Sequence, residues 1–189
     1  DKIKDRITNV YHKLISVGKY DDIKNAKYSF NGKDYNKQKI VCGKGYELKK
    51  LGDLCEFKEK SKRNASYGKL NGKYNFYTSS DKIKKCDTID YNEECLIIGD
   101  GGISNIHIDN NFSCSDHNHI IKTKYNKYIY NLLNGKKDIL ENGFTGSVIK
   151  NLSKTYLINI KIPIPKKESK IKSWTEKISK PFDLKQQKE

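Results

Sequence analysis

Residues 95–122 read CLIIGDGGISNIHIDNNFSCSDHNHIIK, and this stretch decides the fold. It contains short runs of branched apolar residues at 95–98, 103–108 and 119–122. Clusters of glycine, aspartate and asparagine separate these runs. Short β-branched runs that are bounded by turn residues are typical of β-strands. The stretch therefore predicts several short strands joined by tight turns.

The flanking sequence adds further elements on both sides. Residues 74–77 form another strand-like run, whereas apolar residues recur every three or four positions at 125–134 and 168–179. That period predicts amphipathic helices, and 136–142 predicts one more helical turn. In residues 157–164, LINIKIPI, isoleucines alternate with other side chains. We expect a strand there, and its prolines favour a sheet edge or a terminal position.

The N-terminal part of the chain has a different pattern. Residues 1–18 carry apolar side chains at helical spacing and end at a glycine, which predicts an amphipathic helix. Residues 19–45 have weak periodicity and several glycines and asparagines, which predicts a linker. The whole pattern predicts the α+β fold class. A single domain of short strands with small helices at 46–166 is flanked by this N-terminal helix and by a C-terminal amphipathic helix and tail at 167–189.

The charge of the chain favours a polyanionic partner. Its 189 residues include 38 Lys and Arg against 23 Asp and Glu, which gives a net charge of +15. Nucleic acid is the commonest such partner of a basic protein. Lys, Ile, Asn and Tyr all have A/T-rich codons, so we infer an A/T-rich genome, and part of the lysine excess has this second explanation. The chain opens with Asp1 and contains no Met, so we expect it to be a piece of a longer protein.

The cysteines and the apolar runs bear on the compartment. Five cysteines occur at wide spacing and without a CxxC pair, unlike a disulfide scaffold or a zinc ribbon. We expect reduced thiols that pack as small apolar groups, and with them a cytoplasmic protein. No apolar run is as long as a membrane span, so we expect no membrane partner. The cysteines are Cys42, Cys55, Cys86, Cys95 and Cys114.

Polar stretches between the predicted elements are candidates for DNA contact. Residues 58–67, KEKSKRNASY, combine cations for phosphates with side chains that suit phosphates or base edges. Residues 74–80, YNFYTSS, join aromatic rings to hydroxyls, and we expect Tyr77, Ser79 and Ser80 to stay accessible. Residues 143–150, GFTGSVIK, can bring backbone N–H groups to an anion.

These stretches and two further turns supply the predicted DNA-binding residues. For each stretch a solvated loop or a packed turn explains the same residues without any function. The glycines at 99–102 match neither GxGxxG nor GxxxxGK[ST], so we expect a tight turn with positive φ there. The predicted DNA-binding residues are Lys58, Lys60, Lys62, Arg63, Asn64, Tyr67, Tyr77, Ser79, Ser80, Asn105, His117, Asn118, Thr145, Ser147 and Lys150.

The histidines at 117 and 119 offer a different hypothesis. On a strand they share one side, and Cys114 or Asp116 would be candidates to complete a metal site. Further ligands at a workable spacing are missing, so we prefer packed or DNA-facing histidines and predict no catalytic residue and no metal. A metal-dependent nuclease centred on His117 and His119 is the alternative. A module that binds another protein is a further one.

Several motifs occur in order along the chain. They are LKKLGDL at 48–54, TSSDKI at 78–83, IIGDGG at 97–102, FSCSDH at 112–117, GFTGSVIKNLS at 143–153 and LINIKIPIP at 157–165. In this order they resemble the target recognition domain of the specificity subunits of type I restriction–modification systems. They are also similar to related domains that are fused to DNA methyltransferases.

The resemblance implies a module that reads one half of a bipartite DNA site and directs a DNA adenine methyltransferase to it. The helix that follows would act as a spacer and as a docking surface for the methyltransferase. The cofactor, S-adenosylmethionine, would be held by that partner, so the resemblance implies no cofactor in this chain. A restriction endonuclease subunit is a further implied partner. The chain departs from the family where Lys166 and Lys167 follow the closing strand and where Pro181 ends the helix early.

Overall fold

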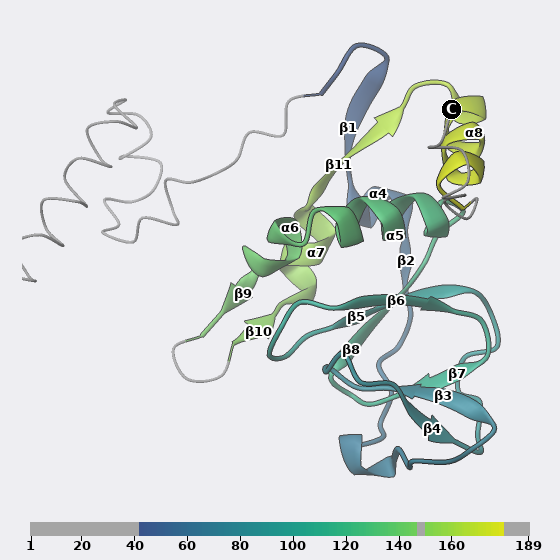
Figure 1. Ribbon diagram of the computed structural model, residues 1–189. Helices are drawn as coiled ribbons and strands as arrows, with labels where there is room; N and C mark the ends of the chain where they lie inside the picture. Colours follow the sequence, from purple (N-terminus) through teal and green to yellow (C-terminus); the bar gives the residue numbers. More distant parts are fainter. Residues whose placement is uncertain (1–41, 147–149, 180–189) are drawn as a thin grey trace, which may run out of the picture. The chain divides into compact units, whose positions relative to one another are not determined.

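The computed structural model describes residues 42–146 and 150–179, and their side chains as far as residue 173 (Figure 1). The predicted N-terminal helix at 1–18, residues 19–41 of the predicted linker, Ser147 and the tail at 180–189 lie outside the described residues. The described part mixes short strands with small helices, so the predicted α+β class is confirmed. The predicted domain boundaries stay predictions. Within the described residues, no helix combines the length and the apolar composition that crossing a membrane requires.

A four-stranded antiparallel sheet forms the centre of the domain. Its central strands are buried almost throughout, and Ile97 of one lies opposite Ile120 of the other. The order of the sheet is β2 (Glu56–Phe57), β8 (Asn118–Lys122), β5 (Cys95–Gly99) and β6 (Ile106–Asp109).

The central sheet is buried on both faces. Leu96, Ile98 and Ile121 belong to one apolar core, whereas Ile97 and Ile120 belong to a second core on the opposite face. Successive side chains of a strand point to opposite faces, so both faces require apolar residues. This double burial explains why the runs in 95–98 and 119–122 lack a regular polar alternation.

A three-stranded sheet covers one face of the central sheet. It consists of β4 (Lys84–Cys86), β3 (Tyr74–Tyr77) and β7 (Phe112–Cys114) in that order. β3 runs antiparallel to β4 and parallel to β7. Tyr77, Phe112 and Cys114 enter the second core, where the rings of Tyr91 and Phe112 stack with centroids 5.1 Å apart.

Helices cover the other face (Figure 1). They bury Ile129, Leu133, Leu140, Leu157 and Ile171 in the first core together with Leu96 and Ile98. The helices are α4 (Leu51–Leu54), α5 (Asn126–Gly135), α6 (Asp138–Glu141), α7 (Lys154–Asn159) and α8 (Glu168–Ser179), and the short 3₁₀ helix η1 (Ala65–Tyr67) lies in the loop before β3.

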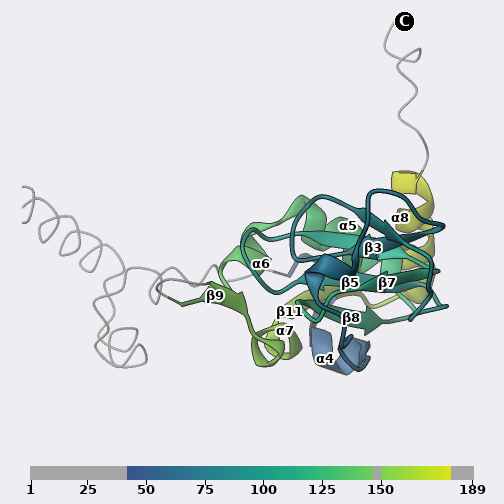
Figure 2. The ribbon, with the colours of Figure 1, turned by 90° about the horizontal axis from the view of Figure 1, so that it is seen from below.

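Two further strand pairs complete the domain. β1 (Tyr46–Lys50) pairs antiparallel with β11 (Lys161–Pro165), with Tyr46 opposite Pro165. β9 (Phe144–Thr145) and β10 (Asn151–Leu152) also pair antiparallel. Figures 1 and 2 place β9 and α8 on opposite sides of this domain.

The structure corrects two of the predicted strands. Residues 154–159 are helical, so only the second part of the predicted strand at 157–164 is extended. The Ser153 hydroxyl accepts a hydrogen bond of 3.1 Å from the backbone N–H of Tyr156, and such a cap starts a helix. The predicted strand at 103–108 begins only at Ile106, because residues 100–105 form the turn before it.

The cysteines are free thiols, as predicted. Cys86, Cys95 and Cys114 are buried, whereas Cys42 and Cys55 are half-buried. Burial raises the pKa of the Cys114 thiol to about 12, which keeps it protonated at neutral pH.

Candidate nucleic-acid interface

The motifs from distant parts of the sequence meet around Asp100, at the end of β5. The Lys60 ammonium group forms an ion pair with the Asp100 carboxylate, and His117 Nδ1 lies 3.2 Å from its other oxygen. The backbone N–H of Asp100 donates to the carbonyl of His117 over 3.1 Å. The backbone N–H of Leu152 donates to the carbonyl of Asp100 over 2.8 Å. We call Lys60, Asp100, His117 and Leu152 the Asp100 junction.

The loop at 58–67 is bound to the turn between β7 and β8 and to Thr88, which follows β4. The carbonyl of Arg63 accepts a 2.8 Å hydrogen bond from the backbone N–H of Asp116. The Asn64 side chain accepts from the backbone N–H of Ser66 over 3.2 Å and so caps η1. The Tyr67 hydroxyl lies 3.2 Å from that of Thr88. The loop therefore has a defined conformation.

Besides Lys60, two further predicted phosphate-binding cations in this loop have acidic partners. Arg63 donates two hydrogen bonds to the Asp90 carboxylate, over 2.6 and 2.8 Å, and its guanidinium lies 4.1 Å from the centroid of the Tyr67 ring. These bonds lower the pKa of Asp90 and raise that of Arg63. Lys58 lies 2.7 Å from a carboxylate oxygen of Glu93, and this bond raises the pKa of Lys58.

Lys62 and Lys150 differ from these paired cations. Both residues are exposed, and neither has an ion-pair partner among the described residues. A groove of about 710 Å³ runs along 58–63 and 90–93, where the paired cations and their acidic partners lie. Among the predicted DNA-binding residues that the structure describes, the unpaired lysines are therefore Lys62 and Lys150.

Three predicted DNA-binding residues are buried, and this corrects the prediction that their side chains are available to DNA. Tyr77 is 4% exposed, Asn105 is 8% exposed and Asn118 is fully buried. The Tyr77 hydroxyl donates to the Asp109 carboxylate over 2.7 Å, and burial raises the pKa of Tyr77, with Asp109 adding to the rise.

The two buried asparagines hold backbone turns together. The Asn105 amide donates to the carbonyl of Ser79 over 2.5 Å, and its oxygen accepts from the backbone N–H of Gly99 over 3.2 Å. The Asn118 amide donates to the carbonyls of Ser115 and Tyr77 over 3.2 and 3.3 Å. Both asparagines are therefore structural residues that hold the loops around Asp100 in place.

Six of the remaining predicted residues are exposed within the part of the chain that the structure describes. Gly101 pairs with Asn151, which joins the β9–β10 hairpin to the turn after β5. A Cβ atom on Gly101 would lie 3.5 Å from the Ser79 hydroxyl, so residues 78–80 border the same turn. Ser79 is half-buried, and the exposed members are Lys62, Asn64, Ser80, His117, Thr145 and Lys150. We call these six exposed residues, with Gly101–Ile103, the loop surface.

The two histidines of the metal hypothesis have different environments. The His117 side chain is 61% exposed and lies beside Asp100. His119 is buried, and its Nε2 lies 2.8 Å from the carbonyl of Leu152, while burial lowers its pKa. Across residues 42–146 and 150–179, no group of three or more His, Cys, Asp or Glu side chains is arranged to hold a metal ion.

Asp100 was not among the predicted site residues, although several of the predicted loops meet at it. The sequence placed it in a glycine-rich turn without a function, although it is only 7% exposed and contacts Lys60 and His117. A signal was present, because an acidic residue directly after an apolar run is a candidate for burial, and a buried carboxylate requires a cationic or hydrogen-bonding partner. The sequence alone does not show that Lys60 and His117 lie close to Asp100 in the folded chain.

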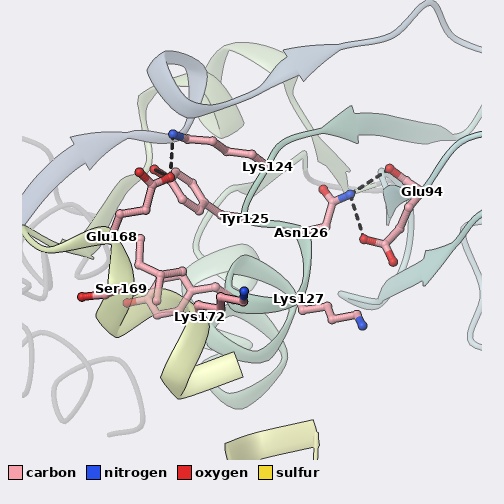
Figure 3. A pocket seen from close by; sticks show the side chains of 10 residues that line it. Glu94, Lys124, Tyr125, Asn126, Lys127, Glu168, Ser169 and Lys172 are labelled. Carbon is pink, nitrogen blue, oxygen red and sulfur yellow. Dashed lines mark hydrogen bonds and ion pairs between the residues drawn. The ribbon is translucent and has the colours of Figure 1, made fainter. Parts of the chain in front are cut away.

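A second cavity lies on the helical side of the domain, between the start of α5 and α8 (Figure 3). Its volume is about 480 Å³. Lys124 and Glu168 form an ion pair of 2.8 Å across it, and the Asn126 amide donates to the carbonyl of Glu94 over 2.8 Å. The charges of Lys124 and Glu168 are thus paired with each other. None of the residues that line this cavity belongs to the loop surface.

Comparisons with known proteins give a family for this arrangement. Residues 43–189 match the model of the family described as type I restriction modification DNA specificity domain. No curated protein matches the chain.

Solved structures with the same fold come from the same class of system. The type I restriction–modification S subunit from M. genitalium has a TM-score of 0.63 and 17% identity, over 76% of this chain and 40% of that one. A structure that describes the assembly and conformational transition of the type I R-M system has a TM-score of 0.50 and 10% identity, over 93% of this chain and 46% of that one. The chain thus spans less than half the length of these structures.

Proposed function

Because the chain belongs to the family of type I restriction modification DNA specificity domains, we propose that it reads a double-stranded DNA sequence and directs a DNA adenine methyltransferase to it. The methyltransferase, as a separate subunit or a fused domain, would hold S-adenosylmethionine and carry out the chemistry. A restriction endonuclease subunit would join the same assembly. This chain would supply binding and choice of sequence.

The observation that carries the proposal is the meeting of the loops at the Asp100 junction. The segments 58–67, 78–80, 99–105, 115–117 and 151–152 are joined there by backbone hydrogen bonds, by the Asn105 side chain and by the Lys60–Asp100 ion pair. Base reading requires several polar groups at fixed positions relative to one another. The hydrogen bonds of the buried Asn105 and Asn118 hold the backbone of these loops in fixed positions.

The exposed groups divide by chemistry into two roles. Lys62 and Lys150 would contact phosphates, because their charges have no acidic partner among the described residues. The hydroxyls of Ser80 and Thr145 would bond phosphates or base edges, and Asn64 and His117 would contact base edges. Ser147 lies between Thr145 and Lys150 in the same loop and stays a predicted contact.

Selection from a random duplex pool tests the proposal. The full chain, alone and together with its methyltransferase, is incubated with random duplexes, and the bound DNA is sequenced over successive rounds. We expect one short sequence to be enriched, and we expect adenine methylation at that sequence once the partner is present. A pool that stays random in both arms would contradict the proposal.

A further inference from the structure

Ile103 is an exposed apolar side chain on the loop surface. It is 82% exposed, although it lies only three residues after the buried Asp100. It occupies the turn between β5 and β6, next to Gly102, whose φ is +80°. A single exposed isoleucine is common on protein surfaces, so exposure alone indicates nothing. Ile103 differs from such residues because its backbone is held by buried side chains and because polar groups lie near its turn.

The turn that carries Ile103 is fixed from below. The buried Asn105 amide lies 3.3 Å from the carbonyl of Ile103 and 2.5 Å from that of Ser79. Ser104 is 4% exposed, and its hydroxyl lies 3.3 Å from a carboxylate oxygen of Glu141. A β-branched side chain on such a backbone has few rotamers, so ordering it against a ligand costs little entropy.

The residues just before Ile103 connect its turn to polar and cationic groups. Gly101 connects the turn to Asn151 of the β9–β10 hairpin, next to Lys150. Asp100 connects it to Lys60 and His117. An apolar group among phosphate- and base-binding groups suits the one apolar feature on the major-groove edge of DNA, which is the 5-methyl group of thymine.

We propose that Ile103 contacts the 5-methyl group of a thymine in the major groove and is a specificity-determining residue. The inference rests on the proposed function, since it assigns a base contact to that same surface. It predicts that one base pair of the recognised sequence is A·T and that its discrimination depends on a methyl group.

Replacing thymine by deoxyuridine tests the contact. The substitution removes the methyl group and keeps every hydrogen-bonding group, and it is made at one thymine at a time in the selected duplex. We expect one position at which it weakens binding of the wild-type chain about three- to fivefold, as for one methyl group removed from an apolar contact. Ile103→Ala should bind the thymine duplex more weakly by a similar factor and should be insensitive to deoxyuridine at that position.

Leu70→Ala is the matched control, because Leu70 is a 95% exposed aliphatic residue on a different loop. It should keep both the wild-type affinity and the deoxyuridine effect. Circular dichroism checks that each variant is folded.

The inference is overturned if no thymine responds to deoxyuridine, if Ile103→Ala keeps the wild-type affinity, or if that variant keeps the deoxyuridine effect. Insertion of Ile103 between bases, for example, would weaken Ile103→Ala without any methyl dependence. In each of these cases the wild-type chain still selects a sequence, so the proposed function stands. If the wild-type chain enriches no sequence at all, the proposed function and this inference both fail.

Discussion

Lys62 and Lys150 are exposed and lack an acidic partner among the described residues, unlike the other predicted phosphate-binding cations. The loop at 58–67 is rich in cations, yet Lys58, Lys60 and Arg63 form ion pairs with acidic residues. A paired cation must lose its partner before it neutralises a phosphate, and this reduces the gain from binding DNA. We therefore expect the exposed, unpaired lysines Lys62 and Lys150 to contribute more to DNA binding than the paired cations of the loop.

The first prediction concerns these two lysines. The double variant Lys62→Ala with Lys150→Ala should weaken duplex binding and reduce the slope of log K against log salt by about 1.8, because each phosphate contact contributes about 0.9. Fluorescence anisotropy titrations at several salt concentrations measure both effects. Lys161→Ala is the control, since Lys161 is exposed on β11. An equal loss in this control would show that the effect is one of net charge only.

The positions of the polar loops were predicted correctly from the sequence, whereas the exposure of individual residues in them was not. Asn64 and Asn118 both lie in polar stretches, but Asn64 is exposed in a loop and Asn118 is fully buried on a central strand. Local composition does not separate these cases, because the burial of Asn118 depends on Tyr77 and Ser115, which are brought to it by the fold. The DNA contacts of the exposed residues stay predictions.

At the scale of elements, strands buried on both faces were predicted well and the segment before the last strand was not. The predicted strand at 74–77 and helix at 168–179 have the observed bounds. Residues 157–159 belong to the alternating stretch at 157–164 for which a strand was predicted, but the Ser153 cap and the burial of Leu157 favour a helical turn there. A cap of one side chain is a weak signal in the sequence, and packing against α4 is not visible in it.

The second prediction tests the support of the β9–β10 hairpin. In Gly143→Ala the new Cβ atom would lie 2.2 Å from the Tyr156 ring and 2.5 Å from the Leu152 side chain, so the substitution overpacks the core. We expect a loss on the order of 1–3 kcal/mol in the free energy of unfolding, measured by urea denaturation. Gly135→Ala is the matched control, because its Cβ atom would meet nothing within 4 Å. Equal stability of the two variants would contradict this packing.

The third prediction concerns pH and His119. Burial lowers the pKa of His119 below its ordinary value of 6.5, and Lys60 and Lys154 lower it further, whereas Asp100 and the Leu152 carbonyl oppose this. The unfolded chain therefore takes up a proton near pH 6.5 that the folded chain does not. Stability conferred by neutral His119 is complete above pH 6.5 and is lost as the pH falls from there towards the folded pKa.

Unfolding by urea between pH 7.5 and 5 measures this loss. His119→Gln should show a smaller decrease in stability over the range than the wild-type chain. His107, whose pKa burial also lowers, adds to the decrease in both proteins. Parallel pH profiles for His119→Gln and the wild-type chain would contradict the assignment.

At the scale of the whole molecule, the net charge of +15 predicts a strong dependence of DNA binding on salt. Counterions leave the duplex for every phosphate that a lysine neutralises. We expect the affinity for duplex DNA to fall at least tenfold between about 50 and 200 mM monovalent salt. Titrations with the selected duplex and with a scrambled one measure this. An affinity that does not change over this range would argue against a phosphate-based interface.

The pairing of β1 with β11 has a consequence for how such a domain can change. Tyr46 and Pro165 lie opposite each other, so the chain passes into and out of the intervening 118 positions through one two-stranded stem. The segment between these two residues contains every residue of the loop surface. A segment of different length or sequence that ends in the same strand pair would join the chain at the same two points. Under the proposed function, we expect the exchange of this one segment to change the DNA sequence that is read.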